Sequence, residues 1–381
     1  MLYLMHVPWG YIKQRPHFLG EYLNGIFDVT IYCLRHTQTR KLADNKLPDN
    51  INVNTLWVSN LPRFINTAIS KYRIKKEVRK NKYIWVTYPK MYDFVKVYLT
   101  SEHVLIYDCM DDALEFPSVK KNDKKRKELF TLEKELCMRS NIIFASAEHL
   151  KNKLINRYKI KNNIYVVNNG IHLTETINEL SKLPDTIDRY FNSDKVKLTY
   201  IGTIAEWIDF EIILESLNKF ENIEYIFVGY NDTKIPSHKR IKYIGPVEHK
   251  YVFSIMENSD VLIMPFILND LILSVNPVKV YEYIYSCKPA LVKKYRETMQ
   301  FEDYVCLYET KDEYFKFIHD VVTSNYTPKH SNEECVQYAR NNTWEHRTQK
   351  MAEYLSTFTL GHLSSPQQFP SSPENPGNQQ V

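Results

Sequence analysis

Leu273-Ser-Val-Asn-Pro-Val-Lys-Val-Tyr-Glu-Tyr-Ile-Tyr-Ser-Cys-Lys-Pro-Ala-Leu-Val292 is the stretch that decides the fold. Asn276-Pro277 indicates a loop that opens a helix, because proline is tolerated in the first helical turn, where its fixed φ suits the backbone. We expect the helix to run to about Ser286 and to end at Lys288-Pro289, before the apolar strand Ala290–Val292. The stretch therefore predicts a loop, a helix and a buried strand, in that order.

Two charged residues of this helix suit the binding of a nucleotide diphosphate-sugar. Lys279 and Glu282 lie three residues apart, so they share one helical face near the N-terminus. Free N–H groups and the helix dipole favour a phosphate at that end. The lysine adds a full positive charge, and the carboxylate can accept hydrogen bonds from a sugar diol. The alternative is an ordinary solvated Lys–Glu pair, which this spacing alone favours.

Length and composition indicate a globular protein of more than one domain. The chain has 381 residues, 44% hydrophobic and 25% charged, enough for two or three domains and a sizeable core. The formal net charge of +5 argues against a strongly basic nucleic-acid binder. No P-loop pattern occurs, so a P-loop NTPase is excluded.

The cysteines and the apolar runs bear on the compartment. The six cysteines are widely separated and form no Cys-x-x-Cys pair, which argues against a zinc site or a disulfide framework and for a reducing cytoplasm. No apolar run is long enough to span a membrane, and Met1–His6 lacks the basic start and apolar core of a signal peptide. We therefore expect a cytoplasmic protein, soluble or peripheral at the inner face of the plasma membrane.

Strand and helix patterns alternate through the first half of the chain. Apolar strands are expected near residues 2–7, 29–34, 52–58, 83–87, 103–107, 141–145 and 163–167, with helices near 17–24, 61–80, 90–99, 124–139 and 146–157. Such alternation predicts an α/β fold with a doubly wound parallel sheet. The ligand site of such a sheet lies beyond the carboxyl ends of its strands, so the loops after Val7, Tyr88 and Tyr107 matter most.

The loop after Val7 carries four candidate acceptor-binding residues: Trp9, Gln14, Arg15 and His17. A Trp ring can stack on a sugar face, while Gln and Arg donate hydrogen bonds to hydroxyls or phosphates. Alternatively, the Trp anchors the loop and the Arg pairs with an acidic neighbour. We favour the binding interpretation, because strand-end loops are where sites occur.

The loop after Tyr107 carries three carboxylates in five residues: Asp108, Asp111 and Asp112. Mutual repulsion can raise the pKa of one of them into the working range of a general base. Alternatively, Asp111 or Asp112 caps the helix that follows. Metal binding is a third interpretation, but no His or Cys completes a ligand set, so no metal site is predicted.

Two cationic stretches, Arg63–Lys82 and Lys120–Lys127, flank this region. A cationic amphipathic helix can lie on an anionic membrane, which would suit a lipid-linked acceptor. The alternative is a core-facing helix with a solvated lysine face. Further along, Ser146 is expected to cap a helix, and His149 is interpreted as a surface or packing residue.

The second half continues with a buried strand, Val196–Thr203, that ends in Gly202, where the absence of a Cβ lets a ligand approach the backbone. Strands near 225–229 and 241–247 follow, and a final amphipathic helix is expected from about Asn332 to Leu355. We divide the chain into an N-terminal domain (1–170), a linker (171–195), a C-terminal domain (196–330), a C-terminal helix that packs back on the N-terminal domain (331–358) and a disordered tail (359–381).

Several segments resemble one known family. Asn276-Pro-Val-Lys-Val-Tyr-Glu-Tyr-Ile with the following Cys-Lys-Pro-Ala-Leu-Val resembles the nucleotide-sugar motif of GT-B-fold glycosyltransferases of family 4, and Ile244–Val247 and Asn258–Phe266 resemble the segments that precede it. The chain is most similar to bacterial transferases of the teichuronic-acid and capsular-polysaccharide type. The resemblance covers roughly 1–355 and is strongest over 196–292.

The resemblance implies two Rossmann-like domains facing a cleft. It places a nucleoside-diphosphate sugar, with UDP as the nucleotide, against the C-terminal domain, and the nucleobase at the loop Gly245–His249. The implied donor residues are Gly202, Thr203, Val247, Ser274, Asn276, Pro277, Val278, Lys279 and Glu282. The loop with Trp9 faces the acceptor, and an Asp of the acidic loop acts there, with Asp111 first and Asp108 and Asp112 next. Neither a metal nor another cofactor is implied.

Two departures from the family pattern stand out. Many relatives carry an Arg and a Lys for the diphosphate where this chain reads Ile204–Asp209, so the charge must fall on Lys279, helix N–H groups or an N-domain residue such as Arg15. Ser274 stands where many relatives have the first glutamate of a pair, which leaves only Glu282. Asp111 would act as a base in an inverting reaction; in a retaining one, which the resemblance favours, the acidic loop would orient the acceptor.

The function that this resemblance implies is a metal-independent, Leloir-type hexosyltransferase of capsule or lipopolysaccharide biosynthesis, acting on a glycan or lipid-linked acceptor. One alternative is a sugar-nucleotide 2-epimerase, which shares the fold and needs no acceptor. Another is a non-catalytic nucleotide-binding partner in a polysaccharide assembly complex. No nucleic acid is expected as a partner.

Overall fold

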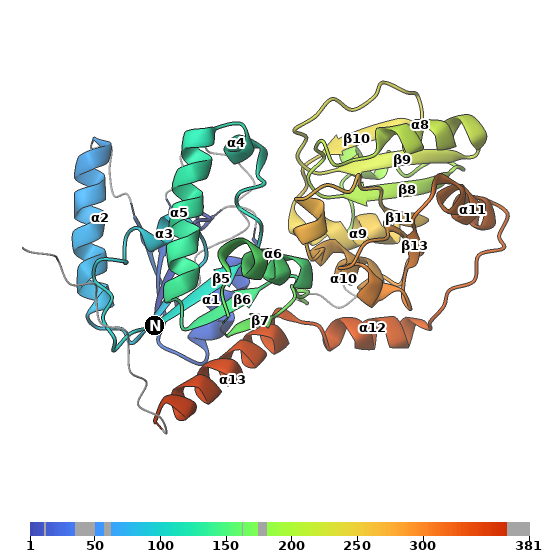
Figure 1. Ribbon diagram of the computed structural model, residues 1–381. Coiled ribbons are helices and arrows are strands. Elements are labelled where there is room, and N and C mark those ends of the chain that lie inside the picture. Colours follow the sequence, from blue (N-terminus) through green and yellow to red (C-terminus); the bar gives the residue numbers. More distant parts are fainter. Residues whose placement is uncertain (11–12, 35–49, 57–61, 162, 174–180, 364–381) are drawn as a thin grey trace, which may run out of the picture.

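A computed structural model describes residues 1–10, 13–34, 50–56, 62–161, 163–173 and 181–363, and it shows two lobes side by side (Figure 1). The N-terminal lobe is built on a seven-stranded parallel sheet of order β3-β2-β1-β4-β5-β6-β7. Its strands are β1 (Leu2–Met5), β2 (Thr30–Cys33), β3 (Asn52–Thr55), β4 (Tyr83–Val86), β5 (Val104–Cys109), β6 (Ile142–Ala145) and β7 (Ile164–Val166). Its helices are α1 (Arg15–Asn24), α2 (Arg63–Val78), α3 (Pro89–Tyr92), α4 (Pro117–Lys120), α5 (Asp123–Arg139) and α6 (Glu148–Tyr158).

Both faces of this sheet are covered, which explains why its strands are apolar throughout. Alternate residues of β1 enter two different clusters: Leu4 packs with side chains of α2, α3, α5 and α6, and Tyr3 packs with side chains of α1 and of a helix from the chain's end. A parallel sheet buried on both faces favours continuous apolar runs over strict alternation.

The C-terminal lobe repeats the design with a six-stranded parallel sheet of order β10-β9-β8-β11-β12-β13. The strands are β8 (Val196–Ile201), β9 (Ile223–Val228), β10 (Ile241–Gly245), β11 (Val261–Met264), β12 (Ala290–Lys293) and β13 (Cys306–Tyr308). The helices are α7 (Asp185–Asp188), α8 (Phe210–Lys219), α9 (Val252–Glu257), α10 (Val278–Tyr285) and α11 (Lys311–Val322), with 3₁₀ turns η2 (His249–Tyr251), η3 (Ile272–Ser274) and η4 (Met299–Phe301). The predicted doubly wound α/β architecture with two Rossmann-like halves is confirmed.

The end of the chain returns to the N-terminal lobe as two helices, not as the single helix expected over 332–355. α12 (Asn332–Arg340) packs on α10, and α13 (Trp344–Leu363) packs on α1 (Figure 1). The break arises because Trp344 N–H donates to Ile171 O at 3.1 Å, a contact between the chain's end and the start of the predicted linker. The helix reaches Leu363, so residues 359–363 of the predicted disordered tail are helical, and residues 364–381 lie outside the described part.

Other local predictions also need correction. The helix expected over 90–99 is only Pro89–Tyr92, followed by turns. Ser146 does not cap α6, because Ala147 occupies the N-cap and the Ser146 hydroxyl donates to Met110 O at 2.7 Å. The helices α8 and α9 were not predicted. The linker segment 171–195 contains α7, and its residues 174–180 lie outside the described part.

We expect Trp344 to stabilise the N-terminal lobe, because it packs in the core of that lobe. Its ring is 1% exposed and stacks on Phe18 at 5.1 Å between centroids, while its Nε1 has no hydrogen-bond partner in the described structure. Trp344→Ala should lower the free energy of unfolding by about 3–5 kcal/mol through lost burial and a cavity. Trp344→Phe keeps an aromatic stack and loses no hydrogen bond, so it should cost clearly less. Urea unfolding measures the free energy of unfolding of both variants. Equal decreases for Trp344→Ala and Trp344→Phe would contradict a role of the aromatic ring in packing.

Candidate functional site

A cavity of about 700 Å³ receives residues from both lobes. Asp111 and Lys121 line it from the N-terminal lobe, and Thr203, Trp207 and Lys279 from the C-terminal lobe. Asp111 and Thr203 follow the carboxyl ends of β5 and β8, the edge at which open α/β sheets bind ligands. The cavity is therefore the place to test the predicted site residues.

Lys279 lies in the first turn of α10, with Pro277 as the N-cap. Its Nζ lies 3.4 Å from the Tyr200 hydroxyl and over the rings of Tyr200 and Phe266, at 5.0 and 5.2 Å from their centroids. No carboxylate of the described residues pairs with it. The ammonium is thus held by neutral rings and keeps its positive charge available to an anion.

Gly202 makes room for this lysine. Its φ is +145°, and an added Cβ would lie 3.0 Å from Lys279 Nζ. A side chain at this position would displace the ammonium and strain the backbone. Gly202, which was predicted from the sequence as a site residue, therefore adjoins Lys279.

Glu282 lies one turn further along α10 and is half-buried. No described residue donates a hydrogen bond to its carboxylate or forms an ion pair with it. Burial raises its pKa, and the positive charges of His249 and Lys279 oppose that rise. A desolvated carboxylate without a partner is costly and well suited to accept hydrogen bonds from a ligand. His249 follows β10, in the loop expected to hold a nucleobase.

The remaining predicted donor residues have other surroundings. Val247 packs into the cluster around Ile226 and Ile255, and Val278 packs against the core of the N-terminal lobe. The buried Ser274 hydroxyl donates to Asp270 O at 3.0 Å, so it does not replace a glutamate.

Asn276 joins the lobes instead of facing the cavity. Its Oδ1 accepts a hydrogen bond from Asn169 N–H at 3.0 Å, and its backbone oxygen accepts one from Asn169 Nδ2 at 2.7 Å. Its place directly before α10 ties the donor helix to the end of the N-terminal lobe.

The acidic loop separates its three carboxylates. Asp108 forms an ion pair with Arg15 at 2.8 Å, and the two side chains are 0% and 1% exposed. Asp112 pairs with Arg157 at 2.6 Å and Lys153 at 2.9 Å. Burial raises the pKa of Asp112, but hydrogen bonds and charges from Arg157 and Lys153 outweigh it and hold the pKa below its ordinary value. Both residues are structural, which corrects their place among the base candidates.

Asp111 is the member of the loop that stays available. Its side chain lines the cavity, and no described residue pairs with its carboxylate. Burial raises its pKa to about 7; Arg15 opposes the rise, and the charges of Asp112 and Asp108 add to it. A carboxylate with this pKa is poised to accept a proton near neutrality.

The loop after β1 is stabilised by the residues that were predicted to bind the acceptor. His17 Nδ1 accepts from Gln14 N–H at 3.1 Å, its Nε2 lies 3.2 Å from Pro8 O, and burial lowers its pKa to about 4. Trp9 packs edge-on to His17 at 5.2 Å between centroids. With Arg15 buried against Asp108 and His17 fully buried, neither can reach an acceptor, so these two are corrected to the structural alternative; the acceptor role of the half-buried Trp9 and Gln14 stays a prediction.

Sequence reasoning missed part of the cavity lining. Glu206 and Trp207, in the loop after β8, and Asp232 and Lys121 line it. The sequence had drawn attention to the loop Ile204–Asp209, but only because it lacks the Arg and Lys of many relatives. The basic run Lys120–Lys127 was interpreted as a membrane surface, whereas its Lys121 faces the cavity.

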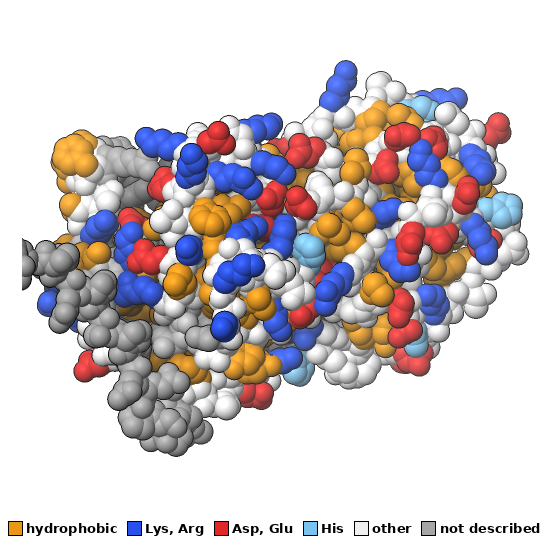
Figure 2. Space-filling view, viewed as in Figure 1, with side chains coloured by type: hydrophobic (Ala, Val, Ile, Leu, Met, Phe, Trp, Pro, Cys, Tyr) orange, Lys and Arg blue, Asp and Glu red, His pale blue; other side chains and the backbone are white. Residues whose placement is uncertain are grey.

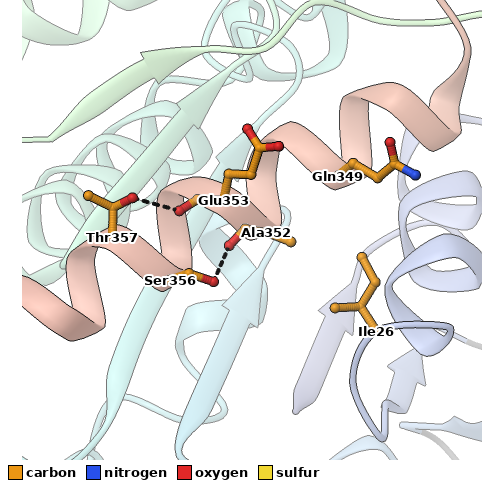
Figure 3. Close-up of a pocket in the computed structure, with 6 residues that line it drawn as sticks. All are labelled: Ile26, Gln349, Ala352, Glu353, Ser356 and Thr357. Atoms are coloured by element: carbon orange, nitrogen blue, oxygen red, sulfur yellow. Dashed lines mark hydrogen bonds between the residues drawn. The ribbon is translucent and has the colours of Figure 1, made fainter.

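A second hollow, of about 460 Å³, lies between Ile26 and α13 (Figure 3). Ser356 and Thr357 line it, but their hydroxyls donate to Ala352 O and Glu353 O of the same helix. Gln349 and Glu353, from the same helix, are the other polar residues that line it. Within the described ranges, no group of three His, Cys, Asp or Glu side chains could hold a metal ion. No helix in the same ranges has the length and apolar character of a membrane span.

Comparisons with known proteins bear on this geometry. No family model matches the chain. A Bacillus subtilis (strain 168) protein, provisionally named as the teichuronic acid biosynthesis glycosyltransferase TuaH, is 24% identical over 250 residues. The match covers 62% of this chain and 61% of that protein, which is less than two thirds of its length.

Solved structures match over almost the whole chain. Anabaena HepE in complex with UDP-glucose is 14% identical with a TM-score of 0.68, covering 93% of this chain and 99% of that one. Sucrose-phosphate synthase from Thermosynechococcus elongatus is 12% identical with a TM-score of 0.70, covering 94% and 99%. With two parallel sheets lining a shared cavity, the fold that the resemblance implied from the sequence is confirmed, and this chain has the GT-B fold.

Proposed function

We propose that this protein transfers a sugar from a UDP-sugar to a hydroxyl of a glycan or lipid-linked acceptor in cell-surface polysaccharide biosynthesis. The observation that carries the proposal is one cavity with two unpaired groups of opposite charge: the Lys279 ammonium from one lobe and the Asp111 carboxylate from the other. Sugar transfer needs both, because a diphosphate must leave and an acceptor hydroxyl must lose a proton.

The donor half uses the amino end of α10. The diphosphate accepts hydrogen bonds from the first-turn amides and from Lys279 Nζ, beside Gly202 and Thr203. The ribose diol donates to the Glu282 carboxylate, and the base lies along Gly245–His249. UDP is the nucleotide in our proposal, because HepE was solved with UDP-glucose and with UDP and glucose. No metal or cofactor is part of the proposal, since Lys279 and backbone amides meet the leaving group's charge.

The acceptor half uses Asp111. The acceptor hydroxyl donates a hydrogen bond to this carboxylate and, in an inverting reaction, its proton. The bond between the sugar C1 and the diphosphate oxygen breaks, a bond between C1 and the acceptor oxygen forms, and UDP leaves with the electron pair. Trp207, which lines the same cavity, provides an aromatic face on which a sugar ring can stack.

A lipid-linked acceptor fits the surface beside the cavity. Figure 2 shows Lys and Arg side chains gathered over α4 and the adjoining end of α5, the region of Lys120–Lys127. On α2, at the side of the N-terminal lobe away from the other lobe (Figure 1), Ile74 and Val78 are buried, whereas Phe64 and Tyr72 are 74% and 64% exposed. Cations with exposed aromatic residues suit an anionic membrane surface. We propose a cytoplasmic enzyme attached peripherally to the inner face of the plasma membrane.

Substitutions in α10 test the donor half. Lys279→Ala should weaken UDP binding at least about tenfold, equivalent to about 1.4 kcal/mol, because a charge-assisted hydrogen bond is lost. Glu282→Gln should weaken it by a similar amount. Isothermal titration with UDP measures both. Lys288→Ala is the matched control, since Lys288 pairs with Glu257 at 3.3 Å. Unchanged affinity in both α10 variants would overturn the donor half.

The pH dependence of transfer tests the acceptor half. Because the pKa of Asp111 is raised to about 7, kcat/KM in an inverting reaction should rise with pH through about 7 as the carboxylate ionises, and fall below it. Asp111→Asn should lower kcat by about 10²–10⁴-fold and remove this limb of the profile, while UDP affinity stays unchanged. Initial rates over pH 5–9 measure both. Conversion of the donor with no acceptor present would instead favour the epimerase.

A further inference from the structure

The amino end of α6 is capped by the opposite lobe. Ala147, its N-cap residue, offers no side-chain acceptor, and the Ser146 hydroxyl is engaged elsewhere. Glu297, which lies between β12 and η4, fills the vacancy: its Oε1 accepts from His149 N–H at 3.1 Å, and Glu148 N–H also bonds to this carboxylate. Glu297 is 4% exposed, so this contact between the lobes is dry.

One turn along, α6 contacts the other lobe a second time. Lys153 Nζ lies 2.9 Å from Asp112 Oδ2 and donates to Asp270 O at 3.1 Å. Asp112 neighbours Asp111 in the acidic loop, and Asp270 precedes Leu271 and Ile272, which line the cavity. A single ammonium therefore bridges the loop that carries the proposed base and the loop that forms the opposite wall.

Arg157, the residue before the last in α6, completes the attachment of the acidic loop. Its guanidinium forms two hydrogen bonds to Asp112, at 3.0 and 2.6 Å, and lies 3.4 Å from Glu133. Glu133 is in turn fixed by the hydroxyls of Tyr107 and Tyr158. The acidic loop is thus held by α6 through Asp112, and α6 is held by the other lobe through Glu297.

We propose that Glu297 and Lys153 are positioning residues for Asp111: the C-terminal lobe sets the place of the base through α6. The proposal rests on the proposed function for its kinetic consequence, but not for its structural one. When Glu297 and Asp270 keep their contacts with α6, Asp112 is fixed and Asp111 faces the cavity. When these contacts are lost, the loop of residues 108–113 loosens although none of its own residues has changed.

Amide hydrogen exchange on the full chain tests the structural consequence without any ligand. Glu297→Gln weakens the cap and Lys153→Met removes the bridge while keeping the aliphatic stem. Each should raise exchange in residues 108–113 at least threefold, beyond any change in 148–152. The matched control is Lys151→Met, because Lys151 lies on the same helix and, among the residues that the structure describes, pairs only with Glu148 of that helix, at 3.8 Å. Exchange that rises in α6 alone would overturn the proposal.

Kinetics test the catalytic consequence. Each of the two variants should lower kcat about tenfold and leave the Kd for UDP within twofold of the parent, since neither residue belongs to the donor site. The double variant should be less impaired than the product of the single effects, because both act through Asp112. Multiplicative effects, or a loss confined to UDP affinity, would contradict the proposal. A parent chain without transfer would refute the proposed function, while the exchange experiment would still judge the contact through α6.

Discussion

The two lobes are joined by a polar chain that begins at a buried guanidinium. Arg15 donates to Asp108, to Val167 O at 2.8 Å and to Asn169 Oδ1 at 3.2 Å. Asn169 then forms two hydrogen bonds with Asn276, the residue that leads into α10 through Pro277. A buried charge must be paired, so the Arg15 guanidinium holds Asp108, the Val167 carbonyl and the Asn169 side chain in place. The strand that carries the acidic loop and the helix that carries Lys279 are thereby held by one connected set of hydrogen bonds.

The acidic loop shows how neighbours separate residues that look alike in sequence. Three aspartates within five residues have similar intrinsic acidity, and the loop pattern named all three as candidates. Arg15, Lys153 and Arg157 neutralise Asp108 and Asp112, and their positions 93, 41 and 45 residues away explain why no local pattern revealed them. Asp111 is the third aspartate; its carboxylate lines the cavity, is desolvated, and forms no ion pair with a described residue. The sequence ranked it first only through resemblance; its environment supplies the physical reason.

Much of the fold was predictable, because the alternation of apolar strands with helices reflects local periodicity. The predictions failed where the local structure depends on a hydrogen bond to a residue far away in the sequence. The final helix breaks because Trp344 N–H bonds Ile171 O. α6 lacks the cap expected at Ser146 because that hydroxyl bonds Met110 O, and Glu297 of the other lobe accepts from His149 N–H instead. Of the donor residues predicted from the sequence, Lys279 lines the cavity and Gly202 adjoins this lysine, and the position of Lys279 in the first helical turn and the glycine at the end of β8 marked both locally. Glu206, Asp232 and Lys121 were not marked in this way, since nothing local shows which side chains of a loop face a cavity.

The charges around the cavity bear on the absence of the Arg and Lys that many relatives carry where this chain has Ile204–Asp209. Asp111, Glu206 and Asp232 face two ammonium groups, Lys121 and Lys279, from opposite lobes. In the proposed complex, a diphosphate would add negative charge to a cavity lined by three carboxylates, so the second ammonium group, Lys121, would support the binding by Lys279 and the helix amides. Lys279 belongs to α10 and Lys121 follows α4, so a ligand would contact both ammonium groups only if it bound to both lobes at once. In the proposed mechanism the same added charge would raise the pKa of Asp111 further, so this carboxylate would be a stronger base while the donor is bound.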